Sequence, residues 1–545
     1  MSGGGDRVVP GPPLSRAAGA EGGAVSGGGE RVVPGPPLSR AAGAATPVPL
    51  PPAPPGASAA PSLPTASYDV VVIGGGAAGA VAALAATEAG ARVVVVRKAY
   101  GATALSSGCI DLGGDPRRLP GDGFAPERRA TLAGRLDLLR RLKPEHPLAV
   151  TGADAAALAE AVEFLRGHVP FVAPAPVGSE PARLVATAAG TWRETGSGAL
   201  GIVRGELLAA AAAPSSGGLA VVGLAGAPWT DAAPPARGLA AALAAEGVDV
   251  EVRPLDVDFL RRPARAPDEV FSVAAALDAP GEGARLGAAI ARALDAAGGA
   301  RPALVLLPPL VGLDRAAAVL AEVEAAAGVR CAEMAAAPPS VPGLRLQRAL
   351  DAALARAGVN VVAGDARGEP GPSAARRRVE RVVVWRAGAA VEAFAGREVV
   401  LATGKFLAGG VVKDPGGPFR EPVLGLRVAD AQGGDPAAEP ERFTARTALA
   451  EHPVFSYGVR VDAALRPLDA GGAVAVDNVR CAGAILAGYA AATDGAALGT
   501  ALFTGLRAGR LAAAAVAAGV PAGAAREMAD RRAEAAALAA GGQHR

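Results

Sequence analysis

The chain has 545 residues, long enough for two or three domains around a large core. Its 54 Lys and Arg residues balance 52 Asp and Glu, and no basic run is interleaved with aromatic residues, so charge implies neither nucleic acid nor an acidic membrane surface as a partner. The cysteines Cys109, Cys331 and Cys481 have no C-x-x-C spacing, which argues against an iron–sulfur cluster, a metal site or a disulfide framework. We therefore expect a small-molecule enzyme.

The N-terminal segment repeats itself. Residues 2–20 recur as residues 26–44 with one change, Asp6 to Glu30, and a Pro-rich stretch over 48–67 follows. A Gly/Pro repeat with a 24-residue period cannot bury a core, so we expect residues 1–67 to form a disordered extension. The first residues lack an apolar signal region and no transmembrane span is evident, so we expect a cytoplasmic protein.

The first folded stretch, residues 68–96, has the pattern of a βαβ unit. An apolar strand at 69–73 meets a turn in which Gly74, Gly76 and Gly79 have the G-x-G-x-x-G spacing, and an Ala/Leu-rich helix and a strand at 92–96 follow. These glycines allow a tight turn, close approach of a phosphate, and tight helix–strand packing. With the N–H groups of the helix N-terminus, they predict a nucleotide site.

The end of the second strand departs from this pattern. Dinucleotide-binding units carry an acidic residue there for a ribose hydroxyl, whereas this chain has Arg97. A guanidinium at this place could pair with a phosphate, which favours FMN or NADP, or FAD held in another way. Alternatively, Arg97 is only a solvated strand end.

The loop at 99–115 leaves the carboxyl end of the sheet, where ligands bind in open α/β folds. It offers small donors and backbone N–H groups to a phosphate or an isoalloxazine edge, and we expect four residues to contact the cofactor: Thr103, Ser106, Ser107 and Gly108. Cys109 is either a redox thiol or a small loop residue. Asp111 either orients the loop or caps a turn.

Residues 117–332 alternate helical runs with short apolar strands, which predicts a second α/β domain inserted into the first. Trp192 and Arg193, on a glycine-flanked loop, either contact a substrate or partner or fill a domain interface. The helix beginning near residue 343 carries Arg345 and Arg348, which either hold an anionic substrate or simply flank the helix.

The C-terminal part of the chain, 333–545, is expected to complete one discontinuous flavin-binding domain with residues 68–116. An apolar strand ends in Ala-Thr-Gly at Thr403 and Gly404, in the manner of the strand that closes the sheet beside a flavin. A second helix N-terminus then follows a glycine-rich stretch, which adds four candidate cofactor residues: Gly483, Asp494, Gly495 and Gly499.

Five motifs together resemble the B-type subunit of bacterial anaerobic glycerol-3-phosphate dehydrogenase, within the fumarate-reductase-like flavoprotein group. They are G-G-G-A-A-G at Gly74, T-A-L-S-S-G-C-I-D-L at Thr103, P-P-S-V-P-G-L-R-L at Pro338, A-T-G-K-F at Ala402 and C-A-G-A-I-L-A-G-Y at Cys481. The resemblance covers about residues 68–514 and implies a three-layer FAD/NAD(P)-binding, Rossmann-like α/β fold with an inserted α/β domain.

The resemblance also implies a function. It indicates a flavin subunit carrying FMN, with FAD as the alternative, beside an FAD-bearing catalytic subunit and an iron–sulfur membrane-anchor subunit. Such a complex oxidises glycerol 3-phosphate to dihydroxyacetone phosphate and passes electrons to quinone, which would place the chain at the inner face of the membrane through a partner. Arg97 is consistent with FMN, which has no adenosine ribose.

Oxidation of a secondary alcohol needs a base and cations for the substrate phosphate. The candidates are His452 as base and Arg345, Arg348 or Lys405 as cations, although His452 could be a turn histidine beside Pro453. Two other hypotheses remain: a self-sufficient FAD-dependent oxidoreductase acting on another hydroxy acid or ketone, and a non-catalytic nucleotide-binding subunit.

Overall fold

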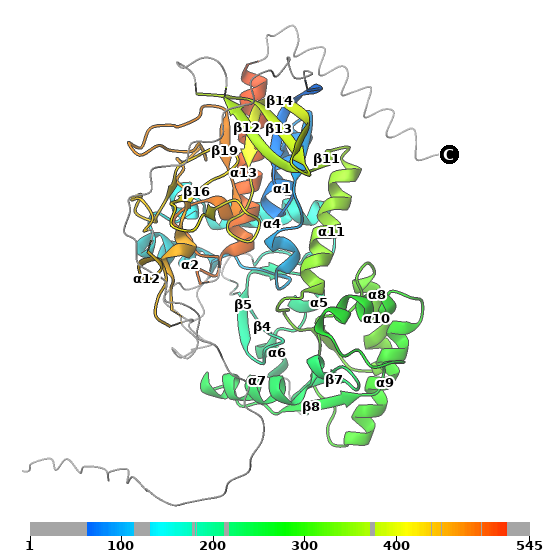
Figure 1. The fold of residues 1–545 in the computed structure, drawn as a ribbon. Helices are drawn as coiled ribbons and strands as arrows, with labels where there is room; N and C mark the ends of the chain where they lie inside the picture. The colour runs from blue at the N-terminus through cyan, green and yellow to red at the C-terminus, as the bar shows by residue number, and fades with distance from the viewer. Residues whose placement is uncertain are drawn as a thin grey trace, which may run out of the picture. The chain divides into compact units, whose positions relative to one another are not determined.

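A computed structural model describes most of the chain (Figure 1). The described residues are 63–113, 131–176, 180, 182–211, 217–370, 377–437, 439–447, 450–491 and 493–519. Residues 1–62 of the expected extension lie outside the described residues. Its last residues are not an extension, because strand β1 (Thr65–Ile73) already begins at Thr65 and pairs with Ala393 of a neighbouring strand.

A seven-stranded sheet organises the first core. Its order is β11, β2, β1, β14, β13, β12, and β19 also pairs with β14. Strands β11, β2, β1, β14 and β19 run parallel, while β12 and β13 are antiparallel to their neighbours. Besides β1, the bounds are β11 (Asn360–Ala363), β2 (Val93–Arg97), β14 (Ala389–Leu401), β13 (Val379–Arg386), β12 (Asp365–Pro370) and β19 (Val479–Cys481).

The valine-rich ends of β1 and β2 are buried on both faces, which is typical of parallel strands covered by other layers. Helices α1 (Ala77–Glu88), α11 (Val341–Arg356) and α13 (Ala497–Ala518) lie side by side against the sheet (Figure 1). Small residues let α1 and α13 come into direct backbone contact: a Cβ at Gly509 would lie 2.2 Å from the carbonyl oxygen of Ala82. The predicted Rossmann-like domain is confirmed.

We predict that Gly509→Ala lowers the free energy of unfolding by about 3 kcal/mol, because the added methyl group forces α1 and α13 apart. Gly167→Ala is the matched control, since Gly167 is also helical but has no atom within 4 Å of the added Cβ. It should raise the free energy of unfolding by about 0.5–1 kcal/mol. Urea midpoints followed by circular dichroism should shift in opposite directions, and equal shifts would contradict the packing argument.

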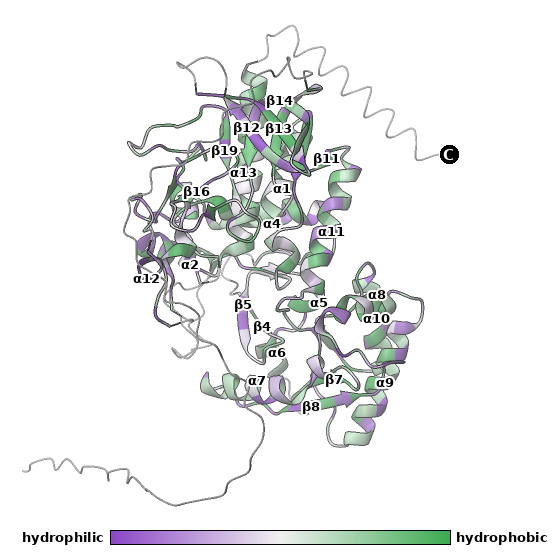
Figure 2. Cartoon of the chain, in the orientation of Figure 1, coloured by the Kyte–Doolittle hydropathy of each residue, from purple (hydrophilic) through white to green (hydrophobic). Residues whose placement is uncertain are grey.

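A second sheet lies mostly within the range of the expected inserted α/β domain. Its four parallel strands have the order β10 (Cys331–Glu333), β9 (Leu304–Leu307), β7 (Leu219–Leu224), β8 (Val252–Val257). Alternate side chains of β7 enter two different cores, one under α7 (Ala233–Ala245) and one under α9 (Glu282–Ala297) and α10 (Ala316–Ala327). The outer helices α9 and α10 alternate green and purple in Figure 2, as expected for helices with one buried face.

The expected boundaries of the inserted domain, 117–332, remain a prediction. Within that range, α2 (Leu132–Leu142), α3 (Pro147–Val150) and α4 (Ala155–His168) contribute buried leucines to the core of the first sheet, not the second. The hairpin of β4 (Arg183–Ala186) and β5 (Trp192–Thr195) follows. Short elements complete the region: β6 (Ser197–Gly198), α5 (Leu200–Val203), α6 (Leu207–Ala211) and α8 (Val270–Leu277).

Helix α13 has the length and apolar content of a membrane span, and it is the one such helix among the described residues. However, 61% of its most apolar window is buried against the rest of the protein, as in the core helix of a globular domain.

Candidate functional site

The glycine turn joins β1 to α1 without room for side chains. Gly74 has a φ of +112°, and a Cβ there would lie 2.2 Å from the carbonyl oxygen of Ala402, at the end of β14. A Cβ at Gly79 would lie 1.9 Å from the carbonyl oxygen of Gly74. The first helical turn of α1 therefore packs tightly against the glycine turn. The N–H groups at the start of α1 face the carboxyl end of the sheet.

Thr103 closes the N-terminus of α1. It lies on the short helix η1 (Ala102–Leu105), and its Oγ1 accepts a hydrogen bond of 2.9 Å from the N–H of Ala77. Gly76 faces this hydroxyl, since a Cβ there would lie 3.1 Å from it. The structure thus brings together Gly74, Gly76, Gly79 and Thr103, four of the residues expected to share one cofactor site.

The motif at Thr103 and the motif at Pro338 contact each other closely. Ser340 caps α11 by accepting a 2.9 Å hydrogen bond from the N–H of Gly343, and its hydroxyl donates to the carbonyl oxygen of Ser106 at 2.5 Å. A Cβ at Gly343 would lie 2.7 Å from the carbonyl oxygen of Ala104. Gly108, with a φ of +86°, packs against Pro342. The Ser106–Gly108 loop is therefore held by α11.

The C-terminal candidates approach the same region. Gly404 has a φ of +74° after β14, and a Cβ at Gly483 would lie 2.7 Å from the Cβ of Ala78 at the start of α1. The start of α13 is tied to the loop after β3 (Cys109–Ile110): Gly113 N–H donates to Gly495 O at 3.1 Å, and Gly499 N–H donates to Asp111 O at 3.1 Å.

These residues fit a nucleotide cofactor. The N-terminus of α1 lies beside glycines that exclude side chains, which leaves backbone N–H groups for phosphate or ring oxygens. The hydroxyl of Thr403 is buried, and none of the described residues forms a hydrogen bond with it. A buried hydroxyl without a partner beside such a turn is consistent with a ligand group that completes the site.

Arg97 does not offer its charge to a phosphate. Its guanidinium forms a two-bond ion pair with Asp351 of α11, with Nη1–Oδ1 at 2.5 Å and Nη2–Oδ2 at 3.1 Å. Tyr100 also donates to Asp351, at 2.9 Å. The interpretation of Arg97 as a phosphate ligand is therefore not supported, and the alternative of a merely solvated strand end does not hold either.

Asp494 lies at the centre of a buried polar cluster. One carboxylate oxygen accepts from Lys143 Nζ at 2.6 Å, and the other accepts from the N–H of Ala490 at 2.7 Å and lies 3.9 Å from His146 Nε2. Both Asp494 and His146 are fully buried. The sequence points to neither Lys143 nor His146 as a member of this cluster, because no local motif links them to a residue about 350 positions later.

Lys405 borders this cluster. Its Nζ donates to the carbonyl oxygens of Phe455 at 2.6 Å and Tyr489 at 3.2 Å. Burial lowers the pKa of Lys405 to about 7, although the nearby carboxylate of Asp494 opposes the shift. A lysine that is partly neutral near pH 7 is better suited to accept a proton than to hold a phosphate.

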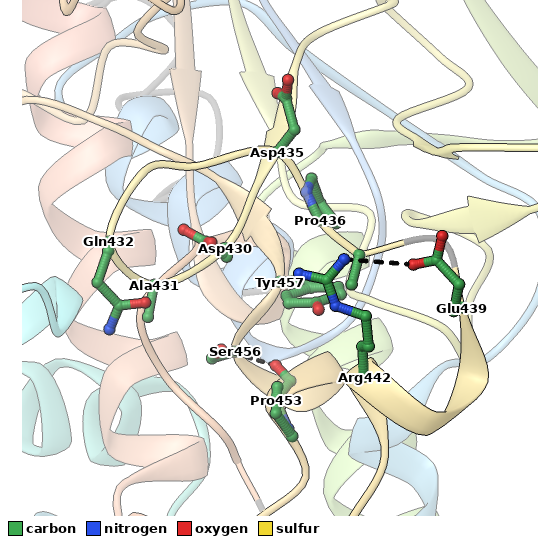
Figure 3. A pocket seen from close by; sticks show the side chains of 11 residues that line it. Asp430, Ala431, Gln432, Asp435, Pro436, Glu439, Arg442, Pro453, Ser456 and Tyr457 are labelled. Atoms are coloured by element: carbon green, nitrogen blue, oxygen red, sulfur yellow. Dashed lines mark hydrogen bonds and ion pairs between the residues drawn. The ribbon is translucent and has the colours of Figure 1, made fainter.

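His452 precedes the short helix η5 (Pro453–Ser456), whose Phe455 binds Lys405. Its Nδ1 accepts a 3.0 Å hydrogen bond from the N–H of Ala445. Beyond η5 is a pocket of about 470 Å³ (Figure 3). The pocket is lined by Asp430, Ala431, Gln432, Asp435, Pro436, Ala437, Glu439, Arg442, Pro453, Ser456 and Tyr457. His452 itself is not among its lining residues, and its role as a base remains a prediction.

Arg345 does not lie in the cofactor site. It is buried in a two-bond ion pair with Glu333 of β10, at 3.0 and 3.1 Å, and donates to the carbonyl oxygens of Val311 and Gly312. This geometry argues against contact with a substrate phosphate, because the guanidinium already donates its hydrogen bonds to groups inside the protein. Arg348 forms a solvent-exposed ion pair with Asp314 at 3.0 Å.

We predict that Arg345→Met lowers the free energy of unfolding by about 3 kcal/mol or more, because it leaves the Glu333 carboxylate buried without a partner. Arg348→Met removes an exposed ion pair and should change it by less than about 0.5 kcal/mol. Chemical denaturation measures both. A raised KM for substrate with unchanged stability in Arg345→Met would instead indicate a substrate ligand.

His146 provides a pH test of the buried cluster. Burial, aided by Lys143 and Lys405, lowers the pKa of His146 to about 3, whereas an unfolded histidine titrates near 6.5. Between these values the unfolded state binds the proton and the folded state does not, so stability present above pH 6.5 is lost as the pH falls.

We therefore predict that in His146→Asn the free energy of unfolding falls less steeply as the pH is lowered from 6 to 4. The slope should be smaller by up to about 1.4 kcal/mol per pH unit. Asparagine can still cap α3, as His146 Nδ1 does by accepting from the N–H of Leu148. Denaturation midpoints at several pH values give the two slopes, and parallel slopes would count against a buried neutral histidine.

Arg193 links the β4–β5 hairpin to the loop at 99–115. Its Nη1 donates to the hydroxyl of Ser107 at 3.0 Å, and its Nη2 forms an ion pair with Asp111.

Burial raises the pKa of the Cys109 thiol to about 11, which disfavours a reactive thiolate. Of the two interpretations of Cys109, the small loop residue fits this environment.

Comparison with known proteins defines the class. Residues 69–500 match the family model described as an FAD binding domain. A flavocytochrome c3 fumarate reductase in its open conformation is similar with a TM-score of 0.37 and 11% identity, covering 83% of this chain and 79% of that chain. Family membership rests on the sequence match: the chain belongs to the FAD-binding domain family of flavoproteins.

The relatives are more particular. The chain is 32% identical over 429 residues to a protein of Halobacterium salinarum strain R1 named as the probable B-type subunit of anaerobic glycerol-3-phosphate dehydrogenase, covering 77% of this chain and 92% of the relative. It is 30% identical over 433 residues to the corresponding subunit of Yersinia enterocolitica, with the same two coverages. Within the flavoproteins, the chain belongs to the family of B-type subunits of anaerobic glycerol-3-phosphate dehydrogenase and is a flavin-dependent dehydrogenase.

The expected preference for FMN is not supported. The matching family is an FAD-binding domain. Arg97 does remove the usual ribose acceptor from the end of β2, but Asp351 neutralises its charge, so it offers no phosphate ligand that would favour FMN.

Proposed function

We propose that the chain is one of two FAD-bearing subunits of a complex that oxidises glycerol 3-phosphate to dihydroxyacetone phosphate and passes the electrons through partner subunits to a quinone. The observation that carries this proposal is the sequence match to relatives named as the B-type subunit of that dehydrogenase. The match spans 92% of the length of each of these relatives. The interlocked Ser106–Gly108 loop and α11 support it, because they bring the motifs at Thr103 and Pro338 into direct contact.

In this proposal FAD is held by the glycine turn, the Thr103 loop, Thr403 and the start of α13. Bound FAD supplies the two-electron acceptor. The residues of the chain orient it: the N-termini of α1 and α13 present N–H groups, and the tie between Gly113 and Gly495 fixes one of them relative to the loop. Lys405, with its pKa lowered to about 7, is the candidate proton acceptor of this chain, and His452 is the second candidate.

The partners follow from the resemblance and remain proposals. They are a second, FAD-bearing catalytic subunit and an iron–sulfur subunit that anchors the complex at the inner face of the membrane, with this chain on the cytoplasmic side. The three cysteines of this chain are buried and unbonded, and the proposal assigns the iron–sulfur centre to a partner subunit.

Purification of the full chain tests the proposal. We expect a yellow protein whose heat-released cofactor co-migrates with FAD in chromatography. Under anaerobic conditions, glycerol 3-phosphate should bleach the flavin when the partner subunits are co-expressed. Bleaching of the isolated chain by another hydroxy acid would favour a self-sufficient oxidoreductase, and a folded but colourless protein would favour a non-catalytic subunit.

A further inference from the structure

The end of β2 lacks the hydrogen-bond acceptor that a dinucleotide needs. Folds of this class place a carboxylate there for the adenosine ribose. Arg97 occupies the position and cannot accept a hydrogen bond. However, the structure brings a carboxylate to the same place from a different element: Asp351 of α11 lies within 3.1 Å of the Arg97 guanidinium.

Asp351 is tied to the glycine turn as well as to β2. Gln347, one helical turn earlier on α11, donates from Nε2 to the carbonyl oxygen of Gly75 at 2.8 Å and to Asp351 Oδ1 at 3.0 Å. Arg97 covers the same turn, since a Cβ at Gly75 would lie 2.6 Å from Arg97 Cδ. The carboxylate is therefore fixed beside the turn that approaches the cofactor phosphates.

Gln347 has an unused acceptor. Two acceptors contact Nε2, which fixes the orientation of the amide. Its Oε1 is then an acceptor in a fully buried side chain, and none of the described residues donates to it. A buried amide oxygen of this kind requires a donor, and a ligand hydroxyl is one.

The second carboxylate oxygen of Asp351 already accepts a hydrogen bond from a hydroxyl group. The phenol of Tyr100 donates to Oδ2 at 2.9 Å, while the residue itself is 48% exposed. A half-exposed tyrosine can leave this contact at small cost, and a ribose hydroxyl offers the same donor. Tyr100 thus occupies the place that a ligand diol would take.

We propose that Asp351 and Gln347 of α11 bind the ribose hydroxyls in the adenosine half of FAD, in place of the missing acid on β2. Arg97 is a positioning residue that holds Asp351 and keeps the site neutral. This inference rests on the proposed function, because it requires FAD as the cofactor.

Flavin affinity tests the proposal. For wild type and Asp351→Asn, Kd values for FAD and FMN are measured by quenching of flavin fluorescence on the full apoprotein. We expect the Kd for FAD to rise about tenfold, as for the loss of a hydrogen bond to a charged group. The Kd for FMN should change less than about twofold, because FMN lacks the adenosine ribose.

Asp314→Asn is the matched control. It breaks a different, solvent-exposed ion pair of α11, the one between Arg348 and Asp314. It should leave both Kd values unchanged. Thermal unfolding of each apoprotein shows whether a change in affinity reflects loss of fold.

A charge exchange tests whether a carboxylate on β2 can replace the carboxylate of Asp351. Arg97→Glu combined with Asp351→Arg keeps the pair and moves the carboxylate onto β2, where the fold class has it. The double variant should bind FAD within about threefold of wild type, whereas Arg97→Glu alone should bind it at least tenfold more weakly.

The outcomes are distinguishable. Equal losses of FAD and FMN binding in Asp351→Asn, or no loss of FAD binding, would overturn the inference while leaving the proposed function intact. A wild-type apoprotein that binds neither flavin would overturn the proposed function and the inference with it.

Discussion

The absence of space around the glycine turn determines the rest of the site. Gly74 and Gly79 touch backbone atoms so closely that one added carbon would separate β1, β14 and α1. Because these three elements cannot move apart, the loops that follow them meet at one edge of the sheet. Thr103 reaches the start of α1 there, and Gly483 packs against the same turn from the far end of the chain.

Much of this could be predicted from the sequence, because the signals are local. The run of β-branched residues before Gly74, the spacing of the glycines and the Ala-Thr-Gly after β14 each lie within a few residues. Such patterns predict both an element and its role in a nucleotide site. The loop at Thr103 lies beside them as expected, since loops at the carboxyl ends of parallel strands share one edge.

The remaining features depend on pairs that are far apart in the chain. Arg97 and Asp351 are 254 positions apart, and nothing near Arg97 shows that its charge is neutralised. Arg345 resembles a substrate ligand in the sequence because its partner Glu333 lies on another element. Amphipathic helices raise a different difficulty: their pattern predicts a buried face but not which sheet covers it, so the sequence does not show that α2–α4 pack in the first core.

The contact between α1 and α13 has a consequence for biosynthesis. The nucleotide turn leaves the ribosome long before α13, yet α1 packs against that helix, which ends at Ala518. Until that helix emerges, the alanine face of α1 is without its cover and is exposed to chaperones and other nascent chains. Truncation before α13 would therefore leave the fingerprint intact but remove the helix that covers α1.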